Sequence, residues 1–444
     1  MKETAKAIFR ATLGALDVRG ALDHHVTRTG SVIRAGANAF DLLAYDKIVA
    51  IAYGKGSYAM AEALGEILLP EFPFEGILVV PTPPKRALSR WWTFVGGHPV
   101  PNAESFSAGN AILDRLHRCD KRTLVLFLLS GGGSSLIESP LPEVSSQKIP
   151  EALDDFRHFN AVLTGCGAPI EEINIVRRHV SATKGGRLAD AARNSTKLTF
   201  GISDVPLGEE TSLCSGPTLP DPSTVSDAEC VIRRYGLGEK LPMRIRDAFA
   251  RGALPETLKE RDGAFANAHF LLILSQHDLT HAAHHACESR GFPCMCDTQT
   301  DNWPLERAAD HLLGILERQK AICPGRSVAV VAGGEVSSPV IGNGLGGRNS
   351  AFVLACVPRI AGKRITVLSA GTDGIDGNSP AAGAVANGES FARAQACGMN
   401  LDDFARRSDA FHFFDRLGDA LDTGPTGMNV RDLRILIAEP DRPV

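Results

Sequence analysis

Several features that would assign a chain to a simple functional class are missing from these 444 residues. No run of 18 consecutive apolar residues occurs, so we expect no membrane partner and no membrane-spanning helix. Aromatic residues make up only 6% of the chain, and the formal net charge is −4. A nucleic-acid partner would require a basic surface and rings for base stacking, so we expect none.

A disulfide framework is also missing, although the chain has ten cysteines. No CxxC pair occurs, and Cys294 and Cys296 are too close together for an ordinary bridge. The first residues show no basic segment followed by an apolar segment, the pattern of a secretory signal. These features predict a cytoplasmic protein in a reducing environment.

The common signatures of phosphate and hydrolase chemistry do not occur. The sequence has no Walker A loop, no protein-kinase signature, no GxSxG elbow and no HExxH helix. Hydrolase functions therefore have no motif to support them, and any phosphate site must be built from other loops.

The sequence does contain a repeated alternation of apolar strands and helical segments. The length of the chain predicts two domains. The alternation predicts that each is an α/β domain with a mostly parallel, Rossmann-like sheet flanked by helices. A polar stretch at about 236–265 places the domains at 1–250 and 251–444, with the active site in the cleft between them. Residues 1–29 are predicted to be helical, and strands are predicted at 47–52, 76–80, 93–95, 124–130, 198–202, 269–274, 327–332, 365–369 and 433–438.

The most informative stretch is the predicted strand 124–130 with the glycine loop that follows it. The loop reads Ser130, Gly131, Gly132, Gly133, Ser134, Ser135. Glycines allow backbone N–H groups to point toward one ligand, and a helix beginning there adds its positive end. The loop therefore favours a phosphate or another anion, while the alternative is a strand-to-helix turn that needs glycine only for packing.

A second glycine turn follows the strand 47–52 and contains Lys55. The pattern Gly54-x-Gly56-x-x-Ala59 matches a dinucleotide fingerprint, but no acidic residue closes the next strand to bind a ribose. A lysine at the carboxyl end of a parallel strand instead points into the crevice where α/β proteins bind ligands. The alternative is a solvated loop lysine.

Three further candidates lie in the first half of the chain. His98 is in a stiff proline-containing loop, where it either contacts an anionic substrate or belongs to a structural turn. Lys184 belongs to the basic segment 174–187, which is either a binding turn or a solvated basic face. Asp204 follows the strand 198–202, which suits a Mg²⁺ ion, a substrate hydroxyl or a turn cap.

The second half has three glycine-rich segments at or near predicted strand ends. They contain Gly334 and Glu335 in the first, Arg348 and Asn349 in the second, and Asp373 in the third. An aspartate in a glycine turn suits Mg²⁺ held by few carboxylates together with phosphates. Cations, amide-rich loops and carboxylates are together the requirements of phosphoryl transfer.

The ordered set of motifs resembles the glycerate 2-kinase family over nearly the whole chain. The first half shows AYGK at 52–55, GHPVP at 97–101, SGGGSS at 130–135, SATKGGRLA at 181–189, SDV at 203–205 and SGPT at 215–218. The second half, with GGE at 333–335, GGRN at 346–349 and GTDGIDG at 371–377, resembles the MOFRL domain of that family. Gly56 and Gln276 depart from the expected pattern, in which alanine and asparagine stand at these positions.

The resemblance implies an enzyme that phosphorylates the 2-hydroxyl of D-glycerate with ATP and Mg²⁺, giving 2-phosphoglycerate and ADP. By the same likeness, Lys55, Asp204 and Arg348 fall on positions important for activity. A homodimer is one assembly compatible with the sequence. The alternatives are an NAD(P)H-dependent hydroxypyruvate reductase, and a module that binds a sugar acid or nucleotide without catalysis.

Overall fold

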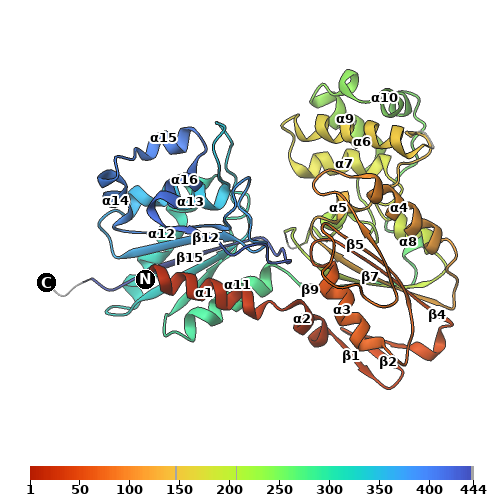
Figure 1. Ribbon diagram of the computed structural model, residues 1–444, viewed down its shortest axis with the longest axis horizontal. Coiled ribbons are helices and arrows are strands. Elements are labelled where there is room, and N and C mark those ends of the chain that lie inside the picture. The colour runs from red at the N-terminus through yellow and green to blue at the C-terminus, as the bar shows by residue number, and fades with distance from the viewer. Residues whose placement is uncertain (146–147, 207, 442–444) are drawn as a thin grey trace. The chain divides into compact units, whose positions relative to one another are not determined.

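The computed structural model describes residues 1–145, 148–206 and 208–441. The chain divides into two compact units. The first domain is Val18–Ile273, and the second domain consists of Met1–Asp17 together with the chain from Leu274 onward. Figure 1 labels many of the elements of both domains. No helix among the described residues is both long enough and apolar enough to cross a bilayer.

A six-stranded sheet with the order β6-β5-β4-β7-β8-β9 forms the centre of the first domain. The pairings that join β6, β5, β4, β7 and β8 are all parallel. Every residue of β7 is buried, as its unbroken apolar run predicts. The strands are β4 (Lys47–Tyr53), β5 (Glu75–Val80), β6 (Trp91–Val95), β7 (Thr123–Ser130), β8 (Thr196–Ile202) and β9 (Ala268–Leu274).

Helices connect these strands and also build a second layer. Phe106 of α4, Phe156 and Phe159 of α6 and Val176 of α7 belong to an apolar cluster shared with α9 and α10. Figure 1 shows α6, α7, α9 and α10 gathered together beyond α5. The helices are α2 (Val18–His25), α3 (Ser57–Leu68), α4 (Ala103–Leu116), α5 (Gly133–Leu136), α6 (Ile149–Thr164), α7 (Ile170–Val180), α8 (Arg187–Ala191), α9 (Val225–Arg234) and α10 (Met243–Ala250).

A small antiparallel sheet was not predicted. It consists of β1 (Val26–Thr29), β2 (Val32–Ala35) and β3 (Asn38–Asp41). The helix predicted for residues 1–29 is instead two helices, α1 (Lys2–Ala15) and α2, followed by the first of these strands.

The second domain contains a mixed sheet with the order β10-β11-β15-β12-β13-β14. Its β10–β11 pairing is parallel, whereas β15 runs antiparallel to both β11 and β12. The prediction of a mostly parallel sheet is therefore wrong for this domain, because an alternation of strands and helices does not report strand direction. The strands are β10 (Cys294–Asp297), β11 (Val328–Gly333), β12 (Ile365–Gly371), β13 (Gly383–Asn387), β14 (Ala420–Leu421) and β15 (Asp432–Ala438).

Helices cover both faces of this sheet, as Figure 1 shows for α12 and α13 on one face and α1 and α11 on the other. The first group packs on alternate strand residues such as Val328, Val330 and Ala332. In α1, Ala5, Ile8 and Phe9 are fully buried. The helices are α1, α11 (Gln276–Glu288), α12 (Leu305–Ile322), α13 (Arg348–Arg359), α14 (Ser390–Ala396), α15 (Leu401–Arg406) and α16 (Ala410–Leu417).

The two α/β domains are confirmed, and their limits differ from the predicted ranges at two places. Residues 251–273 belong to the first domain, where β9 is the edge strand of the sheet. Helix α1 belongs to the second domain, where its apolar face contacts α11 and the sheet. Both elements find apolar partners that are distant in the sequence.

Candidate active site

The glycine loop after β7 is packed closely on its neighbours in the first domain. A Cβ atom on Gly131 would lie 2.2 Å from Oδ2 of Asp204, so the Asp204 carboxylate lies directly against the loop. Gly132 has a φ of +80°, and a Cβ there would meet Cε1 of His98 at 3.2 Å and Cγ of Lys55 at 3.3 Å. The loop therefore brings Lys55, His98 and Asp204 around two adjacent glycines.

Hydrogen bonds fix the turn after β4 against this loop. The backbone N–H of Lys55 donates to the carbonyl of Gly131 at 2.9 Å, and that of Gly56 donates to Oγ of Ser130 at 2.9 Å. Tyr53 pairs with Leu129 in the parallel register, so the two strands end side by side. The carboxyl ends of parallel strands are where α/β proteins place their ligands.

The serines of the loop are connected to further segments. Nδ1 of His98 lies 3.1 Å from Oγ of Ser135, and Oγ of Ser134 lies 2.9 Å from Oγ of Ser215. Gly133 is the first residue of α5, whose N-cap is Gly132. The predicted set Lys55, His98, Ser130–Ser135 and Asp204 is thus a continuous structure within one domain.

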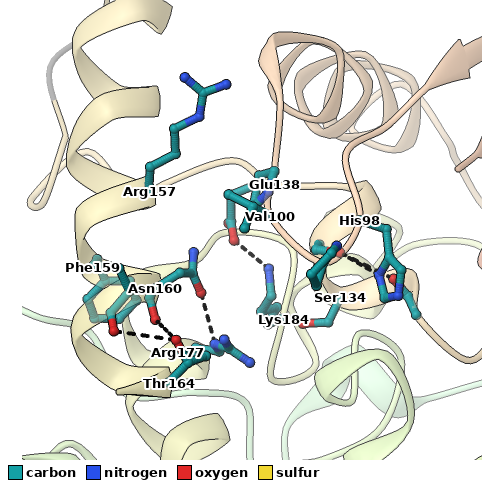
Figure 2. A pocket seen from close by; sticks show the side chains of 15 residues that line it. His98, Val100, Ser134, Glu138, Arg157, Phe159, Asn160, Thr164, Arg177 and Lys184 are labelled. Atoms are coloured by element: carbon teal, nitrogen blue, oxygen red, sulfur yellow. Dashed lines mark hydrogen bonds and ion pairs between the residues drawn. The ribbon is translucent and has the colours of Figure 1, made fainter. Parts of the chain in front are cut away.

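A cavity of about 530 Å³ opens beside this loop, and Figure 2 shows the side chains that line it. Two of the lining residues form an ion pair, in which Nζ of Lys184 lies 2.6 Å from Oε2 of Glu138. Both side chains are at most 5% exposed. The cavity is lined by His98, Pro99, Val100, Pro101, Gly132, Ser134, Ser135, Glu138, Arg157, Phe159, Asn160, Ala161, Thr164, Arg177 and Lys184.

The basic segment 174–187 is not a solvated face. Arg178 is buried and pairs with Asp221 at 3.0 Å, and Nη1 of Arg187 donates to the carbonyl of Arg178 at 2.8 Å. Lys184 is buried with Glu138, while Arg177 faces the cavity. The glycines of the segment let it turn within the domain, and its cations are distributed among internal ion pairs, hydrogen bonds to carbonyls and the cavity.

The candidates of the second domain form a separate charged cluster. Arg348, the first residue of α13, has Nη2 at 2.6 Å from Glu335 and Nε at 2.5 Å from Asp432. Burial opposes the charge of Arg348, but Asp432 and Glu335 outweigh it and raise the pKa of the guanidinium above its ordinary value. Arg348 therefore stays protonated, and the two carboxylates fix its direction.

The turn around Gly334 is held by two buried arginines. Arg431 pairs with Asp301, whose Oδ1 also accepts from the backbone N–H of Glu335 at 2.9 Å. Arg434 is fully buried and donates to the carbonyls of Gly333 and Gly334 at 2.7 and 3.1 Å. Gln276, at the position where asparagine was expected, accepts from Arg431 at 2.8 Å. These contacts fix the backbone that carries Gly334 and Glu335.

Asn349 and Asp373 lie in the same domain. The side-chain oxygen of Asn349 accepts from Oγ of Ser369 at 2.6 Å, which anchors α13 to β12. Oδ1 of Asp373 accepts from the backbone N–H of Ile375 at 3.0 Å. A Cβ on Gly371 would lie 3.1 Å from that oxygen and 3.5 Å from Oδ1 of Asp432, so two carboxylates flank this glycine.

Comparison with known proteins gives matches in both halves of the chain. The model of the domain of unknown function DUF4147 matches residues 4–250, and that of the MOFRL family matches residues 328–432. A protein from Thermotoga maritima named D-glycerate 2-kinase is 31% identical over 407 residues, covering 90% of this chain and 93% of its own.

The chain belongs to the glycerate kinase family. A solved structure titled glycerate kinase from Thermotoga maritima matches this family member with a TM-score of 0.80 at 30% identity, covering 98% of this chain and 99% of that one. A protein from Agrobacterium vitis whose name assigns it provisionally to the hydroxypyruvate reductases is 33% identical, with 88% of this chain and 87% of the relative covered. The names of these relatives therefore refer to two different activities, a kinase and a reductase.

Several residues of the candidate clusters in the two domains were missed by sequence reasoning. Glu138 and Asp432 have no local motif, since their partners Lys184 and Arg348 are 46 and 84 positions away. Arg177 was visible in the basic segment but was not chosen, and a helical periodicity at 170–180 would have separated it from the buried Arg178. Only the tertiary structure identifies these partners.

Replacing Gly131 with alanine tests the close approach of Asp204 to the loop. The added methyl group would overlap the Asp204 carboxylate and displace it, so we expect catalytic turnover to fall at least about tenfold. The matched control is Gly65→Ala in α3, where a Cβ meets nothing within 4 Å. Steady-state kinetics of both variants, with thermal melting to compare their stability, would measure the effect, and equal turnover in the two would contradict it.

Proposed function

We propose that this protein transfers the γ-phosphoryl group of ATP to the 2-hydroxyl of D-glycerate, giving 2-phosphoglycerate and ADP. The observation that carries the proposal is the convergence of Lys55, Asp204 and the glycine loop in a chain of the glycerate kinase family. Phosphoryl transfer requires positioning and charge neutralisation, with little covalent work by the protein. A lysine, a carboxylate and a loop rich in amide donors suit those tasks.

Each group has a distinct role in this proposal. Asp204 orients the attacking hydroxyl and accepts its proton. Lys55 neutralises charge on the migrating phosphoryl group, while the N–H groups and hydroxyls of residues 130–135 donate to its oxygens. Arg348, fixed by Glu335 and Asp432, is a permanent cation of the second domain, and a guanidinium suits the binding of a phosphate.

The residues around Asp373 suit a Mg²⁺ ion that accompanies the nucleotide. No group of three His, Cys, Asp or Glu side chains that could hold a metal occurs among the described residues. Mg²⁺ commonly takes only one or two carboxylates and completes its shell with water and phosphate oxygens. Asp373 would supply the carboxylate, and the bound ion would withdraw charge from the phosphates.

An assay that couples ADP release to NADH oxidation, with D-glycerate, ATP and Mg²⁺, tests the reaction. The position of phosphorylation is read separately by adding enolase alone, which consumes 2-phosphoglycerate but not 3-phosphoglycerate. Release of ADP that depends on glycerate, followed by enolase turnover, is the expected result. Release of ADP without enolase turnover would contradict the 2-hydroxyl as acceptor.

The second candidate function is reduction of hydroxypyruvate, favoured by the name of the Agrobacterium vitis relative and by the Gly54-x-Gly56-x-x-Ala59 pattern. A reductase would consume NADH or NADPH with hydroxypyruvate in a direct absorbance assay without ATP. A binding module without catalysis would give heat with D-glycerate or ATP in calorimetry and no ADP. These three outcomes separate the functions.

A further inference from the structure

The cavity beside the glycine loop has an excess of positive charge after its internal ion pair is counted. Lys184 and Glu138 are buried together and neutralise each other. The two remaining formal charges among the lining residues are the guanidinium groups of Arg157 and Arg177. Such a cavity favours an anion, and a guanidinium binds a carboxylate through two parallel hydrogen bonds.

Arg177 is the better positioned of the two arginines. It comes from α7, and its Nε donates to Oδ1 of Asn160 in α6 at 3.0 Å, as Figure 2 shows. No carboxylate of the described residues lies within 4 Å of its guanidinium, and its Nη atoms have no hydrogen-bond partner in the described part of the chain. By contrast, the side chain of Arg157 is 48% exposed and lies 3.7 Å from Asp154.

The surroundings of Arg177 make an anionic ligand favourable. Burial lowers the pKa of its guanidinium, and the negative charge of Glu138 offsets only part of the loss of water. A carboxylate placed on the Nη groups would compensate that burial. Gly132 also lines the cavity, and a Cβ on Gly132 would lie 3.3 Å from Cγ of Lys55, so the cavity borders the glycine loop of the proposed phosphoryl site.

We propose that Arg177, held by Asn160, binds the carboxylate of the acceptor acid and so directs its hydroxyl toward the glycine loop. This inference rests on the proposed function, because the acid it names is the short hydroxy acid that is phosphorylated. The hydroxyls of Ser134 and Ser135 and the ring of His98 line the same cavity and suit the hydroxyl groups of such an acid. Lys55 is then left to the phosphates.

The test compares the variants Arg177→Met and Arg177→Lys with the control Arg244→Met. Arg244 also contacts α6, where it pairs with Asp155, but it does not line the cavity. We expect Arg177→Met to raise KM for D-glycerate by about 10- to 100-fold, the usual range for a lost charge-assisted bidentate contact, with KM for ATP unchanged. Arg177→Lys keeps the charge but loses the two parallel hydrogen bonds of the guanidinium, so its KM for D-glycerate should be intermediate between those of the wild type and Arg177→Met. Arg244→Met should match the wild type.

Two further measurements make the outcome specific. Methyl D-glycerate has no carboxylate charge, so the preference of the wild type for the acid over this ester should largely vanish in Arg177→Met. Calorimetry with D-glycerate and no nucleotide should show the same loss of affinity, while thermal melting shows an unchanged fold. An unaltered affinity and an unaltered acid-to-ester preference would overturn the role of Arg177.

The two proposals fail in different experiments. A wild type that binds D-glycerate but releases no ADP would overturn the kinase reaction, and the calorimetric comparison would still decide the carboxylate contact. Should Arg177→Met raise KM for ATP and leave that for D-glycerate unchanged, the cavity would bind nucleotide phosphate, and the inference would be overturned while the reaction stands.

Discussion

Replacing Lys55 with alanine is expected to lower kcat by about 100- to 1,000-fold, the usual loss when one group that stabilises transition-state charge is removed. The lysine side chain lies against Gly132, while the bond that fixes its turn is made by its backbone N–H to Gly131. Alanine retains that N–H, so the loop should keep its conformation. Coupled ADP release under saturating substrates measures the change.

The same strand provides a matched control for this variant. Lys47 is the first residue of β4 and is exposed, at the end of the strand opposite Lys55. Lys47→Ala should leave kcat and melting temperature close to those of the wild type. Near-normal turnover in Lys55→Ala would refute the assignment, and a lower melting temperature in that variant alone would indicate a structural role.

Much of the first domain could be predicted because each of its central strands is a short apolar run that can be recognised in the sequence. The run from Thr123 to Ser130 is apolar without interruption, as is most of Lys47–Tyr53, and both became buried parallel strands. The carboxyl ends of neighbouring parallel strands share one edge of a sheet. The proximity of Lys55, Asp204 and the glycine loop was predictable to the extent that their strands are parallel, while the adjacency of β4, β7 and β8 comes from the structure.

In the second sheet, the positions of the central strands could be predicted from the sequence but their order and direction could not. Its strands were found within a few residues, but β15 lies between β11 and β12 and is antiparallel to both. Strand direction depends on the path of the connections, which apolar patterning does not encode. The assignment of α1 to the second domain is similar, because the partners of its apolar face begin more than 250 residues later.

Charged partners were the least predictable part of the candidate site. Arg348 was chosen for its glycine-rich surroundings, yet its direction is fixed by Asp432, which lies at the start of a strand with no motif. Within the basic segment, Arg177 and Arg178 are adjacent in sequence, but one lines the cavity and the other is buried. Ion pairs over long sequence separations leave no periodic signal, so they must be read from the structure.

The buried pair of Arg178 and Asp221 gives the largest expected effect on stability. Asp221 is 2% exposed and Arg178 is 5% exposed, and their side chains meet at 3.0 Å. Asp221→Asn would leave the guanidinium of Arg178 buried without a counter-charge, so we expect the free energy of unfolding to fall by about 3–5 kcal/mol. Denaturant unfolding measures this, with Asp190→Asn at an exposed ion pair as the control, where about 1 kcal/mol or less is expected.

The dependence of this effect on pH has a definite sign. Burial alone would raise the pKa of Asp221, but Arg178 and the donors of Ser223 outweigh it and hold the pKa below its ordinary value. The unfolded chain therefore binds more protons than the folded chain as the pH falls below about 4, and the stabilisation is lost through that range. The stability difference between wild type and Asp221→Asn should thus be largest near neutral pH and shrink in acid. A difference that grows on acidification would mean that the Asp221 carboxyl is protonated in the native protein, contrary to the charge that its partners require.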